Sequence, residues 1–200
     1  MHKGTHKGEA TRQAILDRAV GLASQRGLGG LSIGALAEEL ALSKSGLFAH
    51  FKSKQALDLA TLEHAAARFV EAVIKPVLKA PRGERRVRAM FEHWRRWPAT
   101  NQLEGGCFFI AAASEVDDQP GPVRELLKQQ QKDLLDTIAS VVRTAIQEGD
   151  FRKDVDPEQF AWELYGVLLI LHMSQRLLDD PRADARAETA FAAMLERARK

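Results

Sequence analysis

The sequence predicts an all-α fold of about nine helices. Apolar residues recur in successive segments at the i, i+3, i+4 and i+7 spacing of an amphipathic helix. Glycine, proline or a capping residue marks the ends of most of these segments. Of the 200 residues, 45% are hydrophobic and 28% are charged, which is typical of a soluble chain with ample material for a core. We therefore expect one or two compact helical domains.

Three short helices are predicted within residues 1–53. The first runs from about Glu9 to Arg26 and ends at Gly27. Ser32 is placed to cap the second helix, and a turn over residues 40–42 leads to Ser43, which can cap the third. The apolar face of the second helix consists of Ile33, Leu36, Ala37 and Leu40. The basic residues before the first helix are either a frayed terminus or an arm that reaches DNA, and they are His2, Lys3, His6 and Lys7.

The second and third helices have the spacing of a DNA-binding helix-turn-helix. Leu47 and Phe51 lie one turn apart and can bury against the second helix. The helix starts with Ser43, Lys44, Ser45 and Gly46, which are small or polar, as is required where the N-terminal end of a recognition helix enters the major groove. Residues 1–54 hold eight Lys and Arg against four Asp and Glu, whereas residues 55–200 hold 21 against 23. The positive charge therefore lies on the segment that carries the motif, as DNA binding requires.

The run LSKSGLFAHFKSKQAL, residues 42–57, resembles the TetR/AcrR family of bacterial transcriptional regulators. The resemblance extends weakly over the whole chain. Two departures are Ala41, where the family often has glycine, and Ala49, where it commonly has an aromatic residue. The resemblance implies base-facing positions at Lys44, Ser45, Gly46, Phe48 and Ala49, and phosphate-contacting positions at Ser32, His50 and Lys54. With Ser43 and Lys52, these residues form the predicted DNA-binding site; the alternative is an ordinary solvated surface.

Six further helices are predicted in residues 54–200, which we interpret as an effector-binding and dimerisation domain. They span about 54–75, 84–97, 107–116, 122–148, 157–178 and 183–199. Pro76 is expected to kink or stop the first of them, and Pro98 to limit the second. Asp156-Pro157-Glu158-Gln159 reads as a capping box at the start of the fifth.

The helix predicted over residues 84–97 is basic on one side. Its arginines and Arg82 are either a second nucleic-acid patch or a solvated face that pairs with the acids of residues 115–118, which we consider the better interpretation. The last two helices carry apolar and small residues on more than one side, so they must be covered on both sides. We expect them to form half of a four-helix bundle in a homodimer; the alternative is a monomeric core.

No catalytic or metal-binding pattern is found in the sequence. A phosphate loop, a nucleophile elbow and metal-ligand spacings are all missing, so we expect neither an enzyme nor a cofactor. Cys107 is interpreted as a buried hydrophobe or as an oxidation sensor. Large apolar groups in the body fit either a plain core or a ligand pocket, and the resemblance favours the pocket. The candidate ligand-binding residues are Met90, His93, Trp94, Trp97, Cys107, Phe109, Trp162, Tyr165 and Met173.

The sequence thus predicts a ligand-responsive transcriptional regulator, a repressor released from palindromic double-stranded operator DNA by an apolar or amphipathic small molecule. The alternatives are an architectural DNA-binding dimer without an effector, and a helical ligand-binding protein or enzyme with an incidental helix-turn-helix. The N-terminus has no apolar run able to act as a signal peptide, and a single cysteine suits a reducing compartment. We therefore expect a cytoplasmic protein without a membrane partner.

Overall fold

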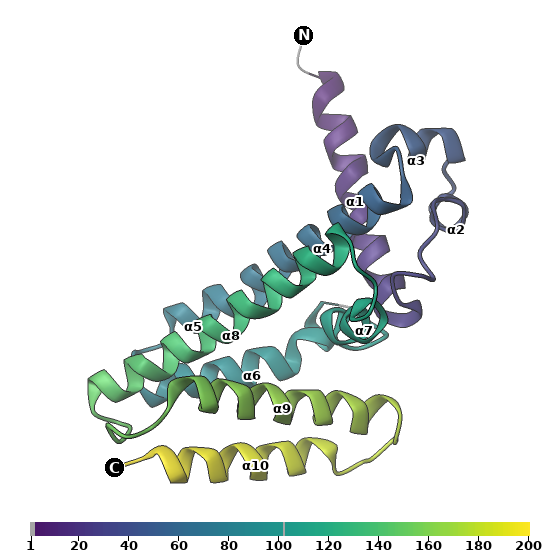
Figure 1. Ribbon diagram of the computed structural model, residues 1–200. Helices are drawn as coiled ribbons and strands as arrows, with labels where there is room; N and C mark the ends of the chain where they lie inside the picture. Colours follow the sequence, from purple (N-terminus) through teal and green to yellow (C-terminus); the bar gives the residue numbers. More distant parts are fainter. Residues whose placement is uncertain (1–2, 102) are drawn as a thin grey trace. The chain divides into compact units, whose positions relative to one another are not determined.

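The computed structural model describes residues 3–101 and 103–200 and is all-α within them (Figure 1). Helices α4, η1 and α5 follow one another without a break, so the described chain has nine continuous helices, as predicted. An isolated antiparallel bridge joins Phe151 and Arg199. The elements are α1 (Lys3–Arg26), α2 (Ile33–Glu39), α3 (Lys44–Phe51), α4 (Lys54–Phe69), η1 (Val70–Ile74), α5 (Lys75–Lys79), α6 (Glu84–Thr100), α7 (Phe108–Val116), α8 (Pro122–Glu148), α9 (Pro157–Arg176) and α10 (Ala183–Ala198).

Two prolines lie inside helices, although Pro76 was expected to kink or stop its helix and Pro98 to limit its own. The turn before Pro76 is π-helical, and the Lys75 N–H donates to the Val70 carbonyl five residues back. This wider turn shifts the hydrogen-bond register just ahead of the missing proline N–H. Pro98 lies within α6, which ends at Thr100. The proline removes one N–H donor there, and the helix ends two residues later, so little of the ladder is lost.

The other helix boundaries are close to the predicted ones. Helix α1 begins at Lys3, six residues before the predicted start. His2 lies outside the described residues, as do the side chains of Lys3, His6 and Lys7. The Asp156 side chain accepts hydrogen bonds from the backbone N–H groups of residues 158 and 159, which confirms its capping role. The Gln159 side chain donates forward to Glu163 rather than reaching back to the cap.

The chain divides into two compact units. Unit 1 consists of residues 1–68 and 98–128, and unit 2 of residues 69–97 and 129–200. This division describes packing, so the functional boundary after residue 53 stays a prediction. None of the described helices is long and apolar enough to cross a membrane.

Unit 1 has a core that joins α1, α2, α3 and the start of α4. Helix α1 also packs against α7, and α2 packs against α3. Burial of these apolar side chains fixes α2 and α3, which have seven and eight residues and are too short to be stable alone. The buried members of this core are Ile15, Leu16, Ala19, Leu22, Leu31, Leu36, Ala37, Leu47, Phe51, Leu57 and Ala60.

Unit 2 is held together mainly by aromatic and aliphatic packing. Helices α9 and α10 pack side by side (Figure 1). The rings of Phe91 and Phe191 stack with their centroids 4.2 Å apart. The Arg199 guanidinium donates to both carboxylate oxygens of Glu84 at 2.7 Å, which ties the end of the chain to the start of α6. This ion pair lowers the pKa of Glu84 to about 2, chiefly through the hydrogen bonds from Arg199.

Candidate nucleic-acid interface

Local signals in the sequence position α2 and its turn. The Ser32 hydroxyl accepts a hydrogen bond from the Ala35 N–H at 3.0 Å, so the predicted cap is confirmed. Leu31, before the cap, and Leu36, at the fourth helical position, are both buried in the core of unit 1, which is the arrangement of a hydrophobic staple. Ala41 has a φ of 51°, in the left-handed region that favours glycine. The alanine at this turn position therefore introduces backbone strain that glycine would avoid.

Helix α3 buries one face and exposes the other. The Ser43 hydroxyl caps it by accepting from the Gly46 N–H at 3.0 Å. Leu47 and Phe51 are buried against the core, as predicted. Phe48 lies on the opposite face and is 52% exposed. The predicted DNA-binding residues are thus available to a ligand: Ser32, Ser43, Lys44, Ser45, Gly46, Phe48, Ala49 and Lys52 are exposed, and His50 and Lys54 are half-buried.

Two basic side chains lie against apolar parts of this motif. The Cε atom of Lys44 lies 3.5 Å from the position that a Cβ atom on Gly34 would occupy, so this side chain runs along the start of α2. The guanidinium of Arg12 lies over the ring of Phe51, 5.4 Å from its centroid. Arg12 was not among the predicted site residues, because a cation–π contact between α1 and α3 has no sequence pattern.

Lys54 serves the fold as well as carrying charge. Its ammonium group donates to the Leu28 carbonyl at 2.8 Å and pairs with Asp58 one turn along α4. Asp58 is buried, and this burial raises the pKa of its carboxyl group, with the nearby Glu115 carboxylate acting in the same direction. Lys54 therefore ties the start of α4 to the turn after α1, in addition to its predicted phosphate contact.

A carboxylate from α7 holds the same turn. The side chain of Glu115 accepts hydrogen bonds from the backbone N–H groups of Leu28, at 2.6 Å, and Gly29. A Cβ atom on Gly29 would overlap this carboxylate, so a larger residue there would require the Glu115 side chain to move. The sequence does not reveal this role of Glu115, because its partners lie 86 and 87 residues away.

Part of the candidate ligand-binding group is brought together in unit 2. Met90, Trp94 and Trp97 are buried on α6. Tyr165 packs edge-on against Trp94, with centroids 5.3 Å apart, and its hydroxyl donates to Gln131 at 2.6 Å. Phe69, which was not among the candidate ligand-binding residues, packs edge-on against both tryptophans. These residues form one aromatic cluster, which fits both the core and the pocket interpretation.

The remaining candidates are dispersed. Trp162 is 68% exposed, and Met173 and His93 are also exposed, so these three do not join the aromatic cluster. Cys107 and Phe109 are buried in unit 1. His172, a polar neighbour of Met173, is half-buried, and desolvation lowers its pKa with a smaller contribution from Arg176. Its imidazole is therefore neutral at pH 7.

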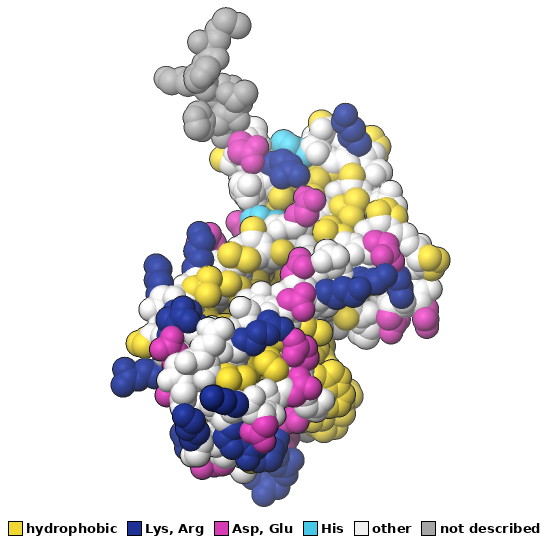
Figure 2. All heavy atoms as spheres, turned by 60° about the vertical axis from the view of Figure 1, so that its left-hand side comes forward, with side chains coloured by type: hydrophobic (Ala, Val, Ile, Leu, Met, Phe, Trp, Pro, Cys, Tyr) yellow, Lys and Arg dark blue, Asp and Glu magenta, His cyan; other side chains and the backbone are white. Residues whose placement is uncertain are grey.

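Arg82 and several arginines of α6 are paired with acids, but not with the predicted ones. Arg82 pairs with Glu148, Arg88 with Glu84, and Arg95 with several carboxylates. The partners of Arg95 are Glu92, Asp184 and Glu188. The prediction of partners in residues 115–118 is wrong for these arginines, since the acids come from α6, α8 and α10. Figure 2 shows the same mixture on one face, where Lys and Arg side chains lie next to Asp and Glu side chains.

Comparisons with known proteins agree with this geometry. A family model described as "Tetracyclin repressor-like, C-terminal domain" matches residues 83–191, and one described as "Bacterial regulatory proteins, tetR family" matches residues 15–61. The search of curated proteins gave no significant match.

Solved structures share the fold over nearly the whole chain. A TetR transcriptional regulator from Chloroflexus aurantiacus J-10-FL is 26% identical, with a TM-score of 0.84 over 96% of this chain and 95% of that one. AibR, solved in complex with isovaleryl coenzyme A and operator DNA, is 26% identical, with a TM-score of 0.68 over 89% of this chain and 96% of its own. A TetR family regulator from Agrobacterium tumefaciens is 18% identical, with a TM-score of 0.83 over 96% and 100%, which concerns the fold alone.

Proposed function

Because the chain belongs to the TetR family of bacterial regulatory proteins, we propose that it binds operator DNA as a homodimer and is released by a small molecule. The observation that carries the proposal is the exposed outer face of α3. Leu47 and Phe51 anchor the helix to the core through its buried face. Lys44, Ser45 and Phe48 therefore face outward on a rigid support. A helix held in this way can enter the major groove with its N-terminal residues at the base edges.

The apolar face of α9 supports the homodimer. Trp162, Leu169, Ile170 and Met173 are exposed at helical spacing, and together they form an apolar stripe that water covers in the single chain. Gly166 lies within this stripe, and a Cβ atom there would meet nothing within 4 Å. A second helix can therefore approach closely at this point. A two-fold pairing would bury the stripe against its own copy.

The aromatic cluster of unit 2 supports an effector with an apolar part. Phe69, Trp94, Trp97 and Tyr165 give a large apolar surface, and the Tyr165 hydroxyl supplies one polar group. AibR, at 26% identity, was solved with both an acyl coenzyme A and operator DNA. We propose an amphipathic effector for this chain on the same grounds, and a repressor whose operator is vacated when the effector binds.

Selection of binding sites from random DNA tests the proposal directly. We expect a palindromic consensus, binding by a dimer, and affinity that falls steeply with salt because lysines displace counterions from phosphates. Lys44→Ala or Ser45→Ala should change the preferred bases, whereas Lys52→Ala should weaken binding to all sequences alike. Enrichment of no consensus would favour an architectural DNA-binding protein and contradict the proposal.

The dimer and the effector have separate tests. Ile170→Glu should give a monomer in sedimentation. Leu78→Glu, at an exposed leucine outside α9, should leave the dimer intact. A ligand screen should find amphipathic compounds that quench tryptophan fluorescence and release the selected operator. Dimers that survive Ile170→Glu would refute the α9 interface, and ligands that bind without releasing DNA would refute the regulatory role.

A further inference from the structure

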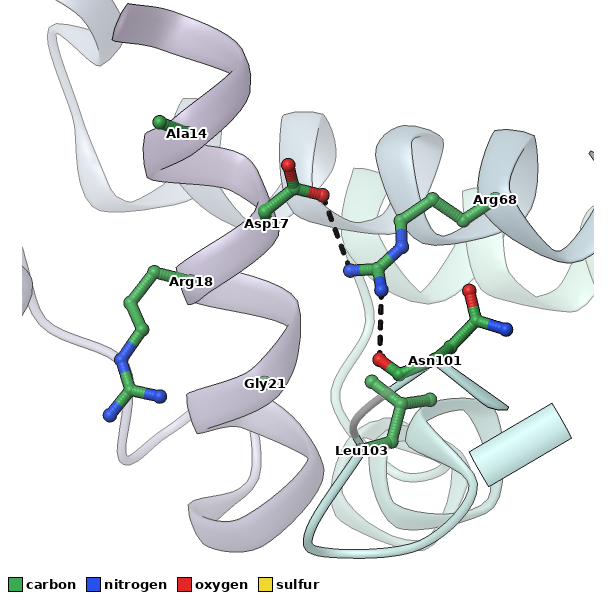
Figure 3. A pocket seen from close by; sticks show the side chains of 7 residues that line it. All are labelled: Ala14, Asp17, Arg18, Gly21, Arg68, Asn101 and Leu103. Carbon is green, nitrogen blue, oxygen red and sulfur yellow. Dashed lines mark hydrogen bonds and ion pairs between the residues drawn. The ribbon is translucent and has the colours of Figure 1, made fainter. Parts of the chain in front are cut away.

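A hollow separate from the aromatic cluster of unit 2 lies within unit 1. Its volume is about 530 Å³, a size typical of small-ligand pockets. Its lining comes from the middle of α1, the end of α4 and the segment after α6 (Figure 3). The lining residues are Ala14, Asp17, Arg18, Gly21, Arg68, Asn101 and Leu103. None of them belongs to the predicted DNA-binding or ligand-binding sets.

Arg68 is the charged group at the centre of this hollow. Figure 3 shows its guanidinium between Asp17 of α1 and the main chain of Asn101. Its Nη1 atom lies 3.3 Å from the Asp17 carboxylate, and its Nη2 atom donates to the Asn101 carbonyl at 2.9 Å. A guanidinium has five N–H donors, so these two contacts leave donors for a bound anion. Arg18 points away from Arg68 and pairs with Glu39.

Asp17 is the group with which an anion would compete. Its carboxylate also contacts the Nε2 atom of His64 at 2.8 Å, so one residue of α1 is tied to two residues of α4. The Asp17 side chain is 57% exposed and that of Arg68 is 23% exposed. Asp17 is exposed and Arg68 partly exposed, and an ion pair that solvent reaches in this way contributes little stability, so a carboxylate from solution can replace Asp17 on Arg68 at small cost.

Gly21 lines the hollow on the side of α1. A Cβ atom there would have only the Arg18 Nη1 atom near it, at 4.0 Å, so alanine would fit without a clash. Glycine inside a helix costs about 0.5–1 kcal/mol relative to alanine. The glycine at this position therefore keeps space open at a cost to helix stability. Ala14 and Leu103 add apolar surface beside it.

We propose that this hollow binds a small carboxylic acid with a short apolar chain. The carboxylate takes the place of Asp17 on Arg68, and the chain lies against Ala14, Gly21 and Leu103. Binding releases one of the two ties between α1 and α4. Because α1 supplies Ile15 and Leu16 to the core that supports α3, the released tie loosens the support of the DNA-binding face. This last step rests on the proposed function, whereas binding itself does not.

Titration of the full chain with hexanoate, without DNA, tests the site by calorimetry. Asp17→Asn should strengthen hexanoate binding several-fold, because it removes the competing carboxylate. Arg68→Gln should abolish hexanoate binding. Gly21→Ala should weaken binding at least tenfold, because the added methyl group takes up space in the hollow, although alanine favours the helix. Arg26→Gln, at an exposed arginine of the same helix, should leave the affinity unchanged. Hexanol, which lacks the charge, should not bind.

Several results would overturn the proposal. Hexanoate affinity that is unchanged by Asp17→Asn and by Gly21→Ala would refute the site even if Arg68→Gln failed to fold. Hexanol binding as tight as hexanoate would refute the role of the carboxylate. A gel-shift assay with the selected operator is then a separate arm. Hexanoate that binds without weakening the operator complex would sustain the site and refute its coupling to α3.

Discussion

Each unit has an apolar core, and a different kind of contact is prominent beside it. In unit 1, charged side chains form hydrogen bonds with the backbone of distant residues. Glu115 accepts from the Leu28 N–H group, and Lys54 donates to the Leu28 carbonyl. In unit 2, rings pack on rings, as Phe91 does on Phe191. Charge-assisted hydrogen bonds are directional, so an isosteric substitution can break one without a cavity. Aromatic packing depends on filled volume, so a substitution weakens it mainly by leaving a cavity.

The largest effect is expected in the aromatic packing of unit 2. Phe91→Ala removes a side chain that is 1% exposed and stacked on Phe191. The lost burial and the resulting cavity should lower the free energy of unfolding by about 3–5 kcal/mol. Urea denaturation measures this change. Leu78→Ala, at a leucine that is 51% exposed, is the matched control, and an equal loss in both variants would show that Phe91 is not a core anchor.

A smaller effect is expected when the polar link of unit 1 is broken. In Glu115→Gln one oxygen still accepts from the backbone, but the amide NH₂ then faces the other N–H group. We expect a loss of about 1–3 kcal/mol, with faster hydrogen exchange at the amides of Leu28 and Gly29. Glu63→Gln, an exposed glutamate on α4, should change neither quantity. Unchanged exchange at both amides in Glu115→Gln would mean that the carboxylate does not hold the turn.

The same contrast explains which features the sequence could predict. Helix caps at Ser32, Ser43 and Asp156 were predictable, because a cap and its donors lie within three residues. The buried face of α3 was predictable from the one-turn spacing of its two anchors. The Glu115 link, the pairs of Arg95 with Asp184 and Glu188, and the Asp17–Arg68 pair join residues far apart in the chain and have no periodicity. The tolerance of Pro76 depended on a π-helical turn that propensity does not reveal.

Acid should weaken the ion pair that closes unit 2. Arg199 lowers the pKa of Glu84 from 4.5 to about 2, so the carboxylate favours the folded state above pH 4.5. This contribution is lost as the pH falls from 4.5 through 2. We expect Glu84→Gln to lower the Tm by roughly 3 °C at pH 7 and to match the wild type near pH 2. Thermal melts across this range measure it, with Glu71→Gln as the control, and a constant difference at all pH values would contradict it.

The smallest effect is expected in unit 1, where a substitution should stabilise the protein and not destabilise it. Burial raises the pKa of the Asp58 carboxyl group in the folded state. At a pH above this raised pKa, the ionised carboxylate therefore disfavours folding. Asp58→Asn mimics the neutral acid and should raise the free energy of unfolding by less than about 1 kcal/mol at pH 7. The gain should vanish as the pH falls below 3.8, where the carboxyl group is protonated in both states. Urea titrations at several pH values test this sign. If Asp58→Asn instead destabilises the protein at pH 7, the pair with Lys54 outweighs the burial of the carboxylate, and charge pairing would dominate in both units.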